Sequence, residues 1–265
     1  MSARPGSPEV TVMMPTYNSV RYVDAAVLSI IGSTLTSWEL LAYDDRSDDG
    51  TLERLQFWAE QDERIVVAQP FADHGSYGEI CNQMIADARG AYCARMDSDD
   101  VSMPTRLERE VDFLASRPGA ILVGGMAHAI MEEEGGVLNT RYPWLAGLVA
   151  PVASETTPVN DALRTFNRMV HATIMARRQD LVDAGGYDTG LFPLEDWALA
   201  LELAESGDVY VLPDILALKR QHAHNGSKRH PNLKPAFAII RDRYGLPLTE
   251  LPKVSQMKLD IPDEA

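Results

Sequence analysis

The stretch of this chain best suited to chemistry is the acidic motif Arg95-Met-Asp-Ser-Asp-Asp100, with three carboxylates in four residues directly after an apolar segment. Carboxylates this close repel one another unless a positive charge lies between them. A hard divalent cation such as Mg²⁺ or Mn²⁺ supplies that charge, and it keeps coordination positions free for phosphate oxygens when only one or two carboxylates bind it. The alternative is a solvated turn that caps a following helix, with Ser102 as the cap.

Two more polar segments follow apolar stretches of the same kind, Pro15-Thr-Tyr-Asn18 and the acidic run of residues 44–50. Asp45 in the second segment could accept a hydrogen bond from a nucleobase N–H or a ribose hydroxyl. Its alternative role lies in the turn before the helix that starts at Thr51. The chain has no G-x-x-x-x-G-K-[ST] motif and no G-x-G-x-x-G motif after its first strand, so any phosphates need a metal and nearby donors.

Hydrophobic periodicity predicts the elements that position these loops. The first half should hold strands at residues 10–14, 38–43, 65–68 and 92–96, and helices at 23–31, from 51, at 78–88 and at 104–116. Strands and helices that alternate in this way, with near-continuous apolar strands, are typical of a parallel sheet with helices on both faces. Ligands bind such sheets beyond the carboxyl ends of the strands, so the three polar loops should meet at one edge.

The second half is less regular. We expect strands at residues 121–123, 127–131, 137–141 (after a hairpin turn at 132–136), 171–176, 209–212 and 215–218, and helices at 194–206 and from 231 to about Tyr244. Residues 143–158 read as a loop-rich, candidate acceptor-binding segment. The sequence shows no internal repeat and no linker between two autonomous halves, which favours one mixed domain.

Composition narrows the class of protein. The formal charge of −15 argues against nucleic-acid binding, which needs a basic face. The 45% hydrophobic and 24% charged residues are typical of a soluble globular protein. Cys81 and Cys93 lie in apolar surroundings and are expected to be buried reduced thiols. No N-terminal signal is visible and the longest apolar stretch, residues 120–130, is too short for a bilayer, so we expect a cytoplasmic protein without a transmembrane segment.

In their order and spacing, these motifs resemble the successive signatures of family 2 glycosyltransferases with the GT-A fold. The likeness rests on residues 10–18, 44–51 and 94–100, on Gly185-Gly-Tyr-Asp188 and Leu194-Glu-Asp-Trp197, and on His171 and Arg220-x-His222-x-x-Asn225-x-Ser227. Arg46 departs from the pattern because the family usually has Gly there, which leaves the local turn geometry open but not the neighbouring Asp45.

The resemblance implies an α/β fold of the GT-A type, in which a mostly parallel nucleotide-binding sheet flanked by helices merges with a smaller mixed acceptor-side sheet. We predict one catalytic domain over residues 1–245. Residues 1–120 would form its nucleotide-sugar-binding half and residues 121–230 its acceptor and catalytic-base half. Residues 246–265 would form an irregular tail.

The resemblance also implies a nucleoside-diphosphate sugar donor, Mn²⁺ or Mg²⁺, and inversion at the anomeric carbon. By position, the donor-binding residues would be Pro15, Thr16, Tyr17, Asp45, Asp97 and Ser98. Asp45 would face a base N–H, which is compatible with uracil and favours a UDP-sugar. Asp99 would ligate the metal at the diphosphate. His222, in a basic run that could close over an anionic diphosphate, would reach the metal or the phosphates.

The resemblance assigns the general base to Asp196. An acceptor hydroxyl is a poor nucleophile until its proton is removed, and a positioned carboxylate contributes ~10²–10⁴-fold to the rate. The neighbouring Glu195 raises the proton affinity of the pair. The alternative is that acids in the first turn of a helix only offset its dipole. We read His171 as a hydrogen-bonded structural residue.

Three functions compete at this stage. The leading one is a metal-dependent inverting glycosyltransferase that acts on a small-molecule, lipid-linked or glycan acceptor. A sugar-nucleotidyltransferase is the first alternative, although residues 15–18 lack the Gly-rich basic loop that it would need. The second is a non-catalytic nucleotide-sugar-binding protein, against which the intact Asp45, Asp99 and Asp196 speak. The sequence carries no signal for the oligomeric state.

Overall fold

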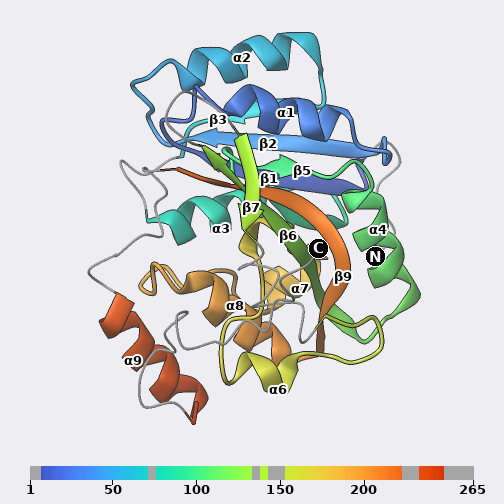
Figure 1. Cartoon of the computed structure of the whole chain (residues 1–265), viewed down its shortest axis with the longest axis vertical. Helices are drawn as coiled ribbons and strands as arrows, with labels where there is room; N and C mark the ends of the chain where they lie inside the picture. The colour runs from blue at the N-terminus through green and yellow to red at the C-terminus, as the bar shows by residue number, and fades with distance from the viewer. Residues whose placement is uncertain (1–6, 71–75, 133–137, 143–152, 223–232, 248–265) are drawn as a thin grey trace.

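The fold is built on one large mixed sheet. The computed structural model describes residues 7–70, 76–132, 138–142, 153–222 and 233–247. Within these ranges nine strands form a sheet of order β3-β2-β1-β4-β8-β6-β9-β5, and β7 pairs with β6 outside that order (Figure 1). The strands of the first half and those of the second therefore share hydrogen bonds in a single layer.

The first half forms the parallel part of the sheet. Its strands are β1 (Val10–Thr16), β2 (Trp38–Asp44), β3 (Ile65–Ala68) and β4 (Tyr92–Arg95). β1 pairs in parallel with both β2 and β4, and β2 pairs in parallel with β3. All seven residues of β1 and of β2 are buried, as expected for apolar strands covered on both faces. The expected α/β class is confirmed.

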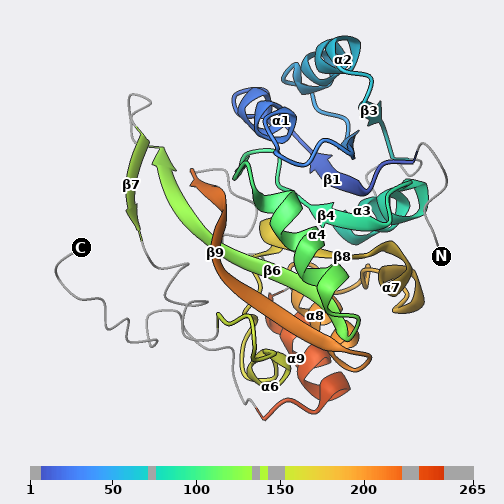
Figure 2. The same ribbon diagram turned by 90° about the vertical axis from the view of Figure 1, so that its right-hand side faces the viewer.

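Helices cover both faces because the strand side chains alternate in direction. The helices in question are α1 (Val23–Ile31), α2 (Thr51–Gln61), α3 (Tyr77–Asp87), α4 (Arg106–Ser116) and α8 (Glu195–Ala204). Val12 belongs to a core cluster with residues of α1, α2 and α4, whereas Met13 belongs to one with residues of α3 and α8. Figure 2 shows α1 and α2 together on one side of the sheet and α8 on the other.

The second half is more continuous than the sequence predicts. The two strands expected at residues 121–131 form one strand, β6 (Ala120–Glu132), and the two at 209–218 form β9 (Asp208–Gln221). Gly124 and Gly125 do not break β6. A Cβ at Gly125 would lie 2.5 Å from Cδ1 of Leu216, so glycine is needed there for close packing. β7 (Leu138–Tyr142) pairs with β6 in antiparallel orientation.

β6 and β9 run parallel, but their register shifts between Gly125 and Met126 and again between Met126 and Ala127. The extra residues lie on β9: Leu212 pairs with Gly125, Ile215 with Met126 and Ala217 with Ala127. Leu216 is the extra residue at the second shift, and Pro213 and Asp214 are the extra residues at the first. This β9 bulge, Pro213 and Asp214, contains a proline that donates no ladder hydrogen bond. Asp214 is tied to Arg109 of α4 at 3.3 Å.

Several boundaries differ from the prediction. The strand expected at residues 171–176 is wrong: a 3₁₀ turn, η2 (His171–Thr173), precedes a shorter strand, β8 (Met175–Arg177). The Thr173 hydroxyl donates to the Val170 carbonyl and competes with strand pairing. β8 pairs with both β4 and β6 in antiparallel orientation.

The acidic loop does not cap a helix through Ser102. Ser102 belongs to β5 (Val101–Ser102), a two-residue strand that the sequence does not predict and that pairs with β9. The following helix begins at Arg106 rather than at residue 104, and its N-cap residue is Thr105. The short helices α6 (Asn160–Leu163) and α7 (Arg178–Asp183) were also not predicted.

Some of the remaining expectations concern residues that the structure describes, and others concern residues outside the described ranges. α9 (Leu233–Tyr244) ends where predicted, and Cys81 and Cys93 are free and buried as expected. The predicted hairpin turn, most of the loop at 143–158, the residues from 223 to 232 and the tail beyond 247 lie outside the described ranges. None of the described helices is long and apolar enough to cross a bilayer.

Candidate functional site

A cavity of about 930 Å³ lies at the carboxyl ends of β1, β2 and β4. Parallel strands end at the same edge of a sheet, so their loops meet there. The structure brings all nine residues singled out from the sequence to the lining of this one cavity. They are Pro15, Thr16, Tyr17, Asp45, Asp97, Ser98, Asp99, Asp196 and His222.

The loops after β1 and β2 are tied to each other. The Asp45 amide donates to the Thr16 carbonyl at 2.8 Å, and the Asp48 amide donates to Oδ1 of Asn18 at 3.0 Å. Arg46 has a φ of 57°, the left-handed conformation that glycine adopts most easily. The turn is therefore formed despite the arginine, which answers the geometric question that this residue raised.

One carboxylate oxygen of Asp45 accepts no hydrogen bond from the described residues. This oxygen, Oδ1, is buried. A buried polar atom without a partner is costly, so a ligand donor is a natural complement. Tyr17, on the adjacent loop, is 61% exposed and lines the same cavity.

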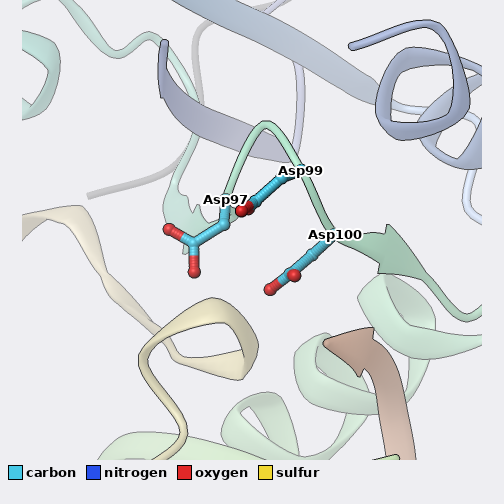
Figure 3. Close-up of side chains that lie close together, drawn as sticks. All are labelled: Asp97, Asp99 and Asp100. Carbon is cyan, nitrogen blue, oxygen red and sulfur yellow. The ribbon is translucent and has the colours of Figure 1, made fainter. Parts of the chain in front are cut away.

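The acidic loop joins β4 to β5, and Asp97, Asp99 and Asp100 project from a single turn of it (Figure 3). Each offers a carboxylate oxygen, and these oxygens lie within 4.8 Å of one another. Ser98 faces the β1 side, where its hydroxyl lies 2.7 Å from that of Ser19. The loop is thus anchored to the loop after β1, and Asp97 and Asp99 line the cavity.

Asp97 is held by two cations of the protein. Nη2 of Arg95 lies 2.6 Å from its Oδ1, and Nζ of Lys219 on β9 lies 3.0 Å from its Oδ2. Burial alone would raise the pKa of Asp97, but Lys219 and Arg95 outweigh it and hold the pKa well below its usual range. Burial likewise opposes the charge on Lys219, yet Asp97 and Asp100 raise the pKa of its ammonium.

Asp99 has a different partner. Its Oδ2 lies 2.9 Å from Nε2 of His222, at the carboxyl end of β9, and its carbonyl accepts from Nε of Arg220 at 2.9 Å. The His222 ring stacks on Tyr22 with 4.8 Å between centroids. Imidazole and carboxylate side chains are both ligands of divalent metals in proteins.

Asp196 lies in the first turn of α8 and lines the same cavity as the acidic loop. Nδ2 of Asn167 donates to its Oδ2 at 2.9 Å, and the Trp197 amide lies 2.7 Å from its Oδ1. Burial raises the pKa of Asp196, while these two hydrogen bonds oppose the rise. The adjacent Glu195 is 5% exposed, and its burial together with the Asp196 charge raises its pKa to about 8.

Glu195, with a pKa raised to about 8, therefore keeps its proton at neutral pH. The hydrogen bonds from Asn167 and the Trp197 amide favour the charged form of Asp196. The helix dipole alone does not explain the arrangement, because a first-turn acid that only offsets a dipole needs no amide partner from a separate segment. The two acids form a polarised pair at the cavity wall.

His171 is hydrogen-bonded as expected. Its Nε2 lies 2.8 Å from the Tyr187 hydroxyl, and burial together with the nearby Arg95 lowers its pKa well below the usual value. It is neutral at physiological pH. It also lines the cavity, which the sequence alone did not indicate.

Several lining or supporting residues were not singled out from the sequence. Lys219 was only part of a basic run, and the strand alternation of β9 could have separated its direction from that of Arg220. Arg95 was quoted in the acidic motif without a role. Asn167, which supports Asp196 from the segment between α6 and η2, shows no sequence signal, because only the tertiary fold brings it there.

Solved structures share this architecture. S. aureus TarS 1-349 in complex with UDP-GlcNAc superposes with a TM-score of 0.70 at 18% identity, over 88% of this chain and 66% of that one. The mannosyltransferase PcManGT from Pyrobaculum calidifontis, in complex with GDP-Man and Mn²⁺, gives 0.63 at 20% identity, over 92% of this chain and 64% of that one. The curled, mostly parallel sheet defines a GT-A fold.

The family follows from the sequence comparison. The model described as Glycosyl transferase family 2 matches residues 11–183, so the chain belongs to this family. One relative, the "Putative glycosyltransferase EpsE" of Bacillus subtilis (strain 168), is 33% identical over 183 residues, 68% of this chain. The chain spans 60% of the length of EpsE. Family membership favours glycosyl transfer over the nucleotidyl transfer considered from the sequence.

Proposed function

We propose that this protein transfers a sugar from a nucleoside-diphosphate donor, with a UDP-sugar favoured, to an acceptor hydroxyl with inversion of the anomeric centre. One observation carries the proposal: the loops after β1, β2 and β4 and the side chain of Asp196 line a single cavity. A donor held by the loops would turn its anomeric carbon toward an acceptor beside Asp196.

The nucleoside would bind at the loops after β1 and β2. The unused Oδ1 of Asp45 suits a base N–H, which uracil offers. The half-exposed ring of Tyr17 offers a face for the base or the ribose. The TarS complex with UDP-GlcNAc supports a uridine donor, and the PcManGT complex shows that a GT-A relative also accepts a guanosine donor.

The donor sugar would bind deeper in the cavity. Nε and Nη1 of the buried Arg95, and Oε2 of the buried Glu195, have no hydrogen-bond partner within the described part of the chain. Both residues line the cavity. A sugar hydroxyl can accept from one group and donate to the other, so the pair suits a polyhydroxylated ligand.

A divalent metal would be held by Asp99 with His222, next to the donor diphosphate. The donor set fits because Asp99 and His222 already lie within 2.9 Å of each other and both line the cavity. Bound there, Mn²⁺ or Mg²⁺ would offset the negative charge that develops on the departing diphosphate.

Asp196 would accept the proton of the acceptor hydroxyl. The oxygen of that hydroxyl then forms a bond to the anomeric carbon while the bond to the diphosphate oxygen breaks, and attack from the opposite face inverts the centre. Asn167 orients the carboxylate and favours its ionised form, whereas Glu195 retains its own proton at neutral pH. No covalent sugar–protein species is needed.

The decisive experiment is a donor screen followed by a transfer assay. Thermal shift with UDP, GDP and thymidine diphosphate, with and without Mn²⁺, identifies the nucleotide, because a ligand that binds the native state raises the melting temperature. Release of that nucleoside diphosphate is then measured with candidate sugar and lipid-linked acceptors. If none of these nucleotides raises the melting temperature, the proposal is refuted.

A further inference from the structure

Two of the three clustered acids, Asp97 and Asp100, share one cation of the protein, Lys219. Asp97 contacts Arg95 at 2.6 Å and Lys219 at 3.0 Å. Asp100, which is 1% exposed, accepts from the Arg220 amide at 2.7 Å through Oδ1, and its Oδ2 lies 3.6 Å from Nζ of Lys219. The positive charge that adjacent carboxylates require is therefore supplied within the chain.

Lys219 is the shared element of this arrangement. Its ammonium lies between Oδ2 of Asp97 and Oδ2 of Asp100, and its side chain is 23% exposed toward the cavity. β9 fixes this position, because the Arg220 amide that follows Lys219 is itself bonded to Asp100. A lysine ammonium is a compact point charge, which suits the space between two carboxylates.

Asp99 stands apart from this clamp. Its Oδ2 faces His222 at 2.9 Å, and the side chains of Asp99 and His222 are 22% and 10% exposed. Nζ of Lys219 lies within 4 Å of Asp97 and Asp100, so a divalent ion at the cluster would compete with Lys219 most directly for these two acids. The three acids thus differ in their protein partners, although their oxygens are all within 4.8 Å of one another.

We propose that Lys219 is a positioning residue that fills the cation position between Asp97 and Asp100 and so confines divalent-metal binding to Asp99 and His222. The metal half of this inference rests on the proposed function. Without Lys219, Asp97 and Asp100 would lie close enough for one ion to bridge, since opposite oxygen ligands of Mg²⁺ or Ca²⁺ are roughly 4 to 5 Å apart.

Mn²⁺ binding tests the inference without any assay of activity. Free Mn²⁺ is titrated by electron paramagnetic resonance against the wild-type protein, Lys219→Met, Lys219→Arg and the control Lys234→Met, which changes an exposed lysine on α9. We expect Lys219→Met to bind Mn²⁺ at least about tenfold more tightly, because Asp97 and Asp100 lose the one cation that they share, while Arg95 still contacts Asp97. Lys219→Arg and Lys234→Met should stay within about twofold of the wild type.

Removal of Asp99 separates this inference from the proposed function. Asp99→Asn should lose Mn²⁺ binding in the wild-type background, whereas Lys219→Met with Asp99→Asn should retain it through Asp97 and Asp100. If Asp99→Asn alone leaves Mn²⁺ affinity unchanged, Asp99 does not bind the metal and that part of the proposed function is wrong. The Mn²⁺ affinity of Lys219→Met still tests the role of Lys219.

Loss of the lysine could also prevent folding, because it leaves Asp97 and Asp100 without their shared cation. In that case Mn²⁺ should restore the native melting transition of Lys219→Met, and Mg²⁺ should do so more weakly. Equal Mn²⁺ affinity of folded Lys219→Met and the wild type, or a failure of Mn²⁺ to restore folding, would overturn the inference.

Discussion

Nδ2 of Asn167 donates a hydrogen bond of 2.9 Å to Oδ2 of Asp196. The amide comes from the segment that precedes η2, whereas the carboxylate belongs to the first turn of α8. Burial favours the protonated form of Asp196, and this hydrogen bond favours the ionised form. A general base must be ionised before it can accept a proton, so Asn167 supports the proposed role of Asp196 without contact with the reacting atoms.

Asn167→Leu should therefore shift the pH dependence of transfer. A hydrogen bond to a charged group contributes about 1.5–3 kcal/mol, so its loss should raise the pKa of Asp196 further. The acid limb of kcat against pH moves to higher pH, and wild type and variant converge at alkaline pH. Gln179→Leu, which changes an exposed amide on α7, should leave the profile in place. A pH-independent loss of kcat would contradict this role.

Asp196→Asn should abolish transfer and spare donor binding. The substitution keeps the volume of the side chain but removes the proton acceptor, which is expected to lower kcat by about 10²–10⁴-fold. Calorimetric titration with the nucleoside diphosphate should give a Kd within about threefold of the wild type. Turnover close to that of the wild type would place the base on another residue.

Glu195→Gln should flatten the pH dependence of stability. The pKa of Glu195 is raised to about 8 in the folded protein, from an ordinary value of 4.5. Between these values the native state keeps a proton that the unfolded chain releases, so stability falls as pH rises, by at most about 1.4 kcal/mol per pH unit. In urea unfolding at pH 5, 6, 7 and 8, the unfolding free energy of the variant should increase relative to that of the wild type with each step in pH. A constant difference across this series would disprove the raised pKa.

Arg46→Gly should preserve both the turn and nucleotide binding. A left-handed residue with a Cβ costs about 1–2 kcal/mol, and glycine removes this strain but increases the entropy of the unfolded chain. We expect a change in unfolding free energy within about 1 kcal/mol and an unchanged Kd for the nucleotide. Arg46→Val should lower stability by at least about 1 kcal/mol and weaken binding through displacement of Asp45. Equal behaviour of both variants would show that the φ of 57° is not required.

Gly186→Ala tests how the segment before α8 is held. Asn82 makes two hydrogen bonds to the backbone of Tyr187. Its Nδ2 donates to the Tyr187 carbonyl at 2.8 Å, and its Oδ1 accepts from the Tyr187 amide at 2.7 Å. A Cβ on Gly186 would lie 2.3 Å from that Oδ1. We expect a loss of about 2 kcal/mol or more in unfolding free energy, from clash and strain together.

Gly185→Ala provides the matched control. Gly185 also has a positive φ, of 81°, but a Cβ there would meet no described atom within 4 Å. This variant should lose only about 1 kcal/mol, the cost of the left-handed backbone. Equal losses in the two alanine variants, measured by urea unfolding, would show that Asn82 does not constrain the segment.

The sequence predicts the parallel half of the fold well, for a physical reason. Near-continuous apolar strands such as β1 and β2 are separated by helices with clear periodicity, so local pattern and tertiary structure agree. Because parallel strands end at one edge, the convergence of the polar loops on one cavity also follows from the sequence. The family match agrees with the resemblance inferred from those same loops.

The second half is harder because tertiary contacts override local signals. Gly124 and Gly125 suggest a break but lie within the continuous β6, since they face Met169 and Leu216 at close range. The pairing of Lys219 with Asp97, and of Asn167 with Asp196, depends on which segments the sheet brings together. No periodicity in the chain encodes such long-range partners.

The β9 bulge at Pro213 and Asp214 has a consequence for how this chain can vary. Side chains point alternately to the two faces of a sheet along a strand. The number of residues between Leu212 and Lys219 therefore determines that the ammonium of Lys219, and not the side chain of Leu218, contacts Asp97. A single-residue deletion there would rotate the whole distal end of the strand by one step and carry His222 away from Asp99. The number of residues in the β9 bulge, which does not line the cavity, thus determines which charged side chains do.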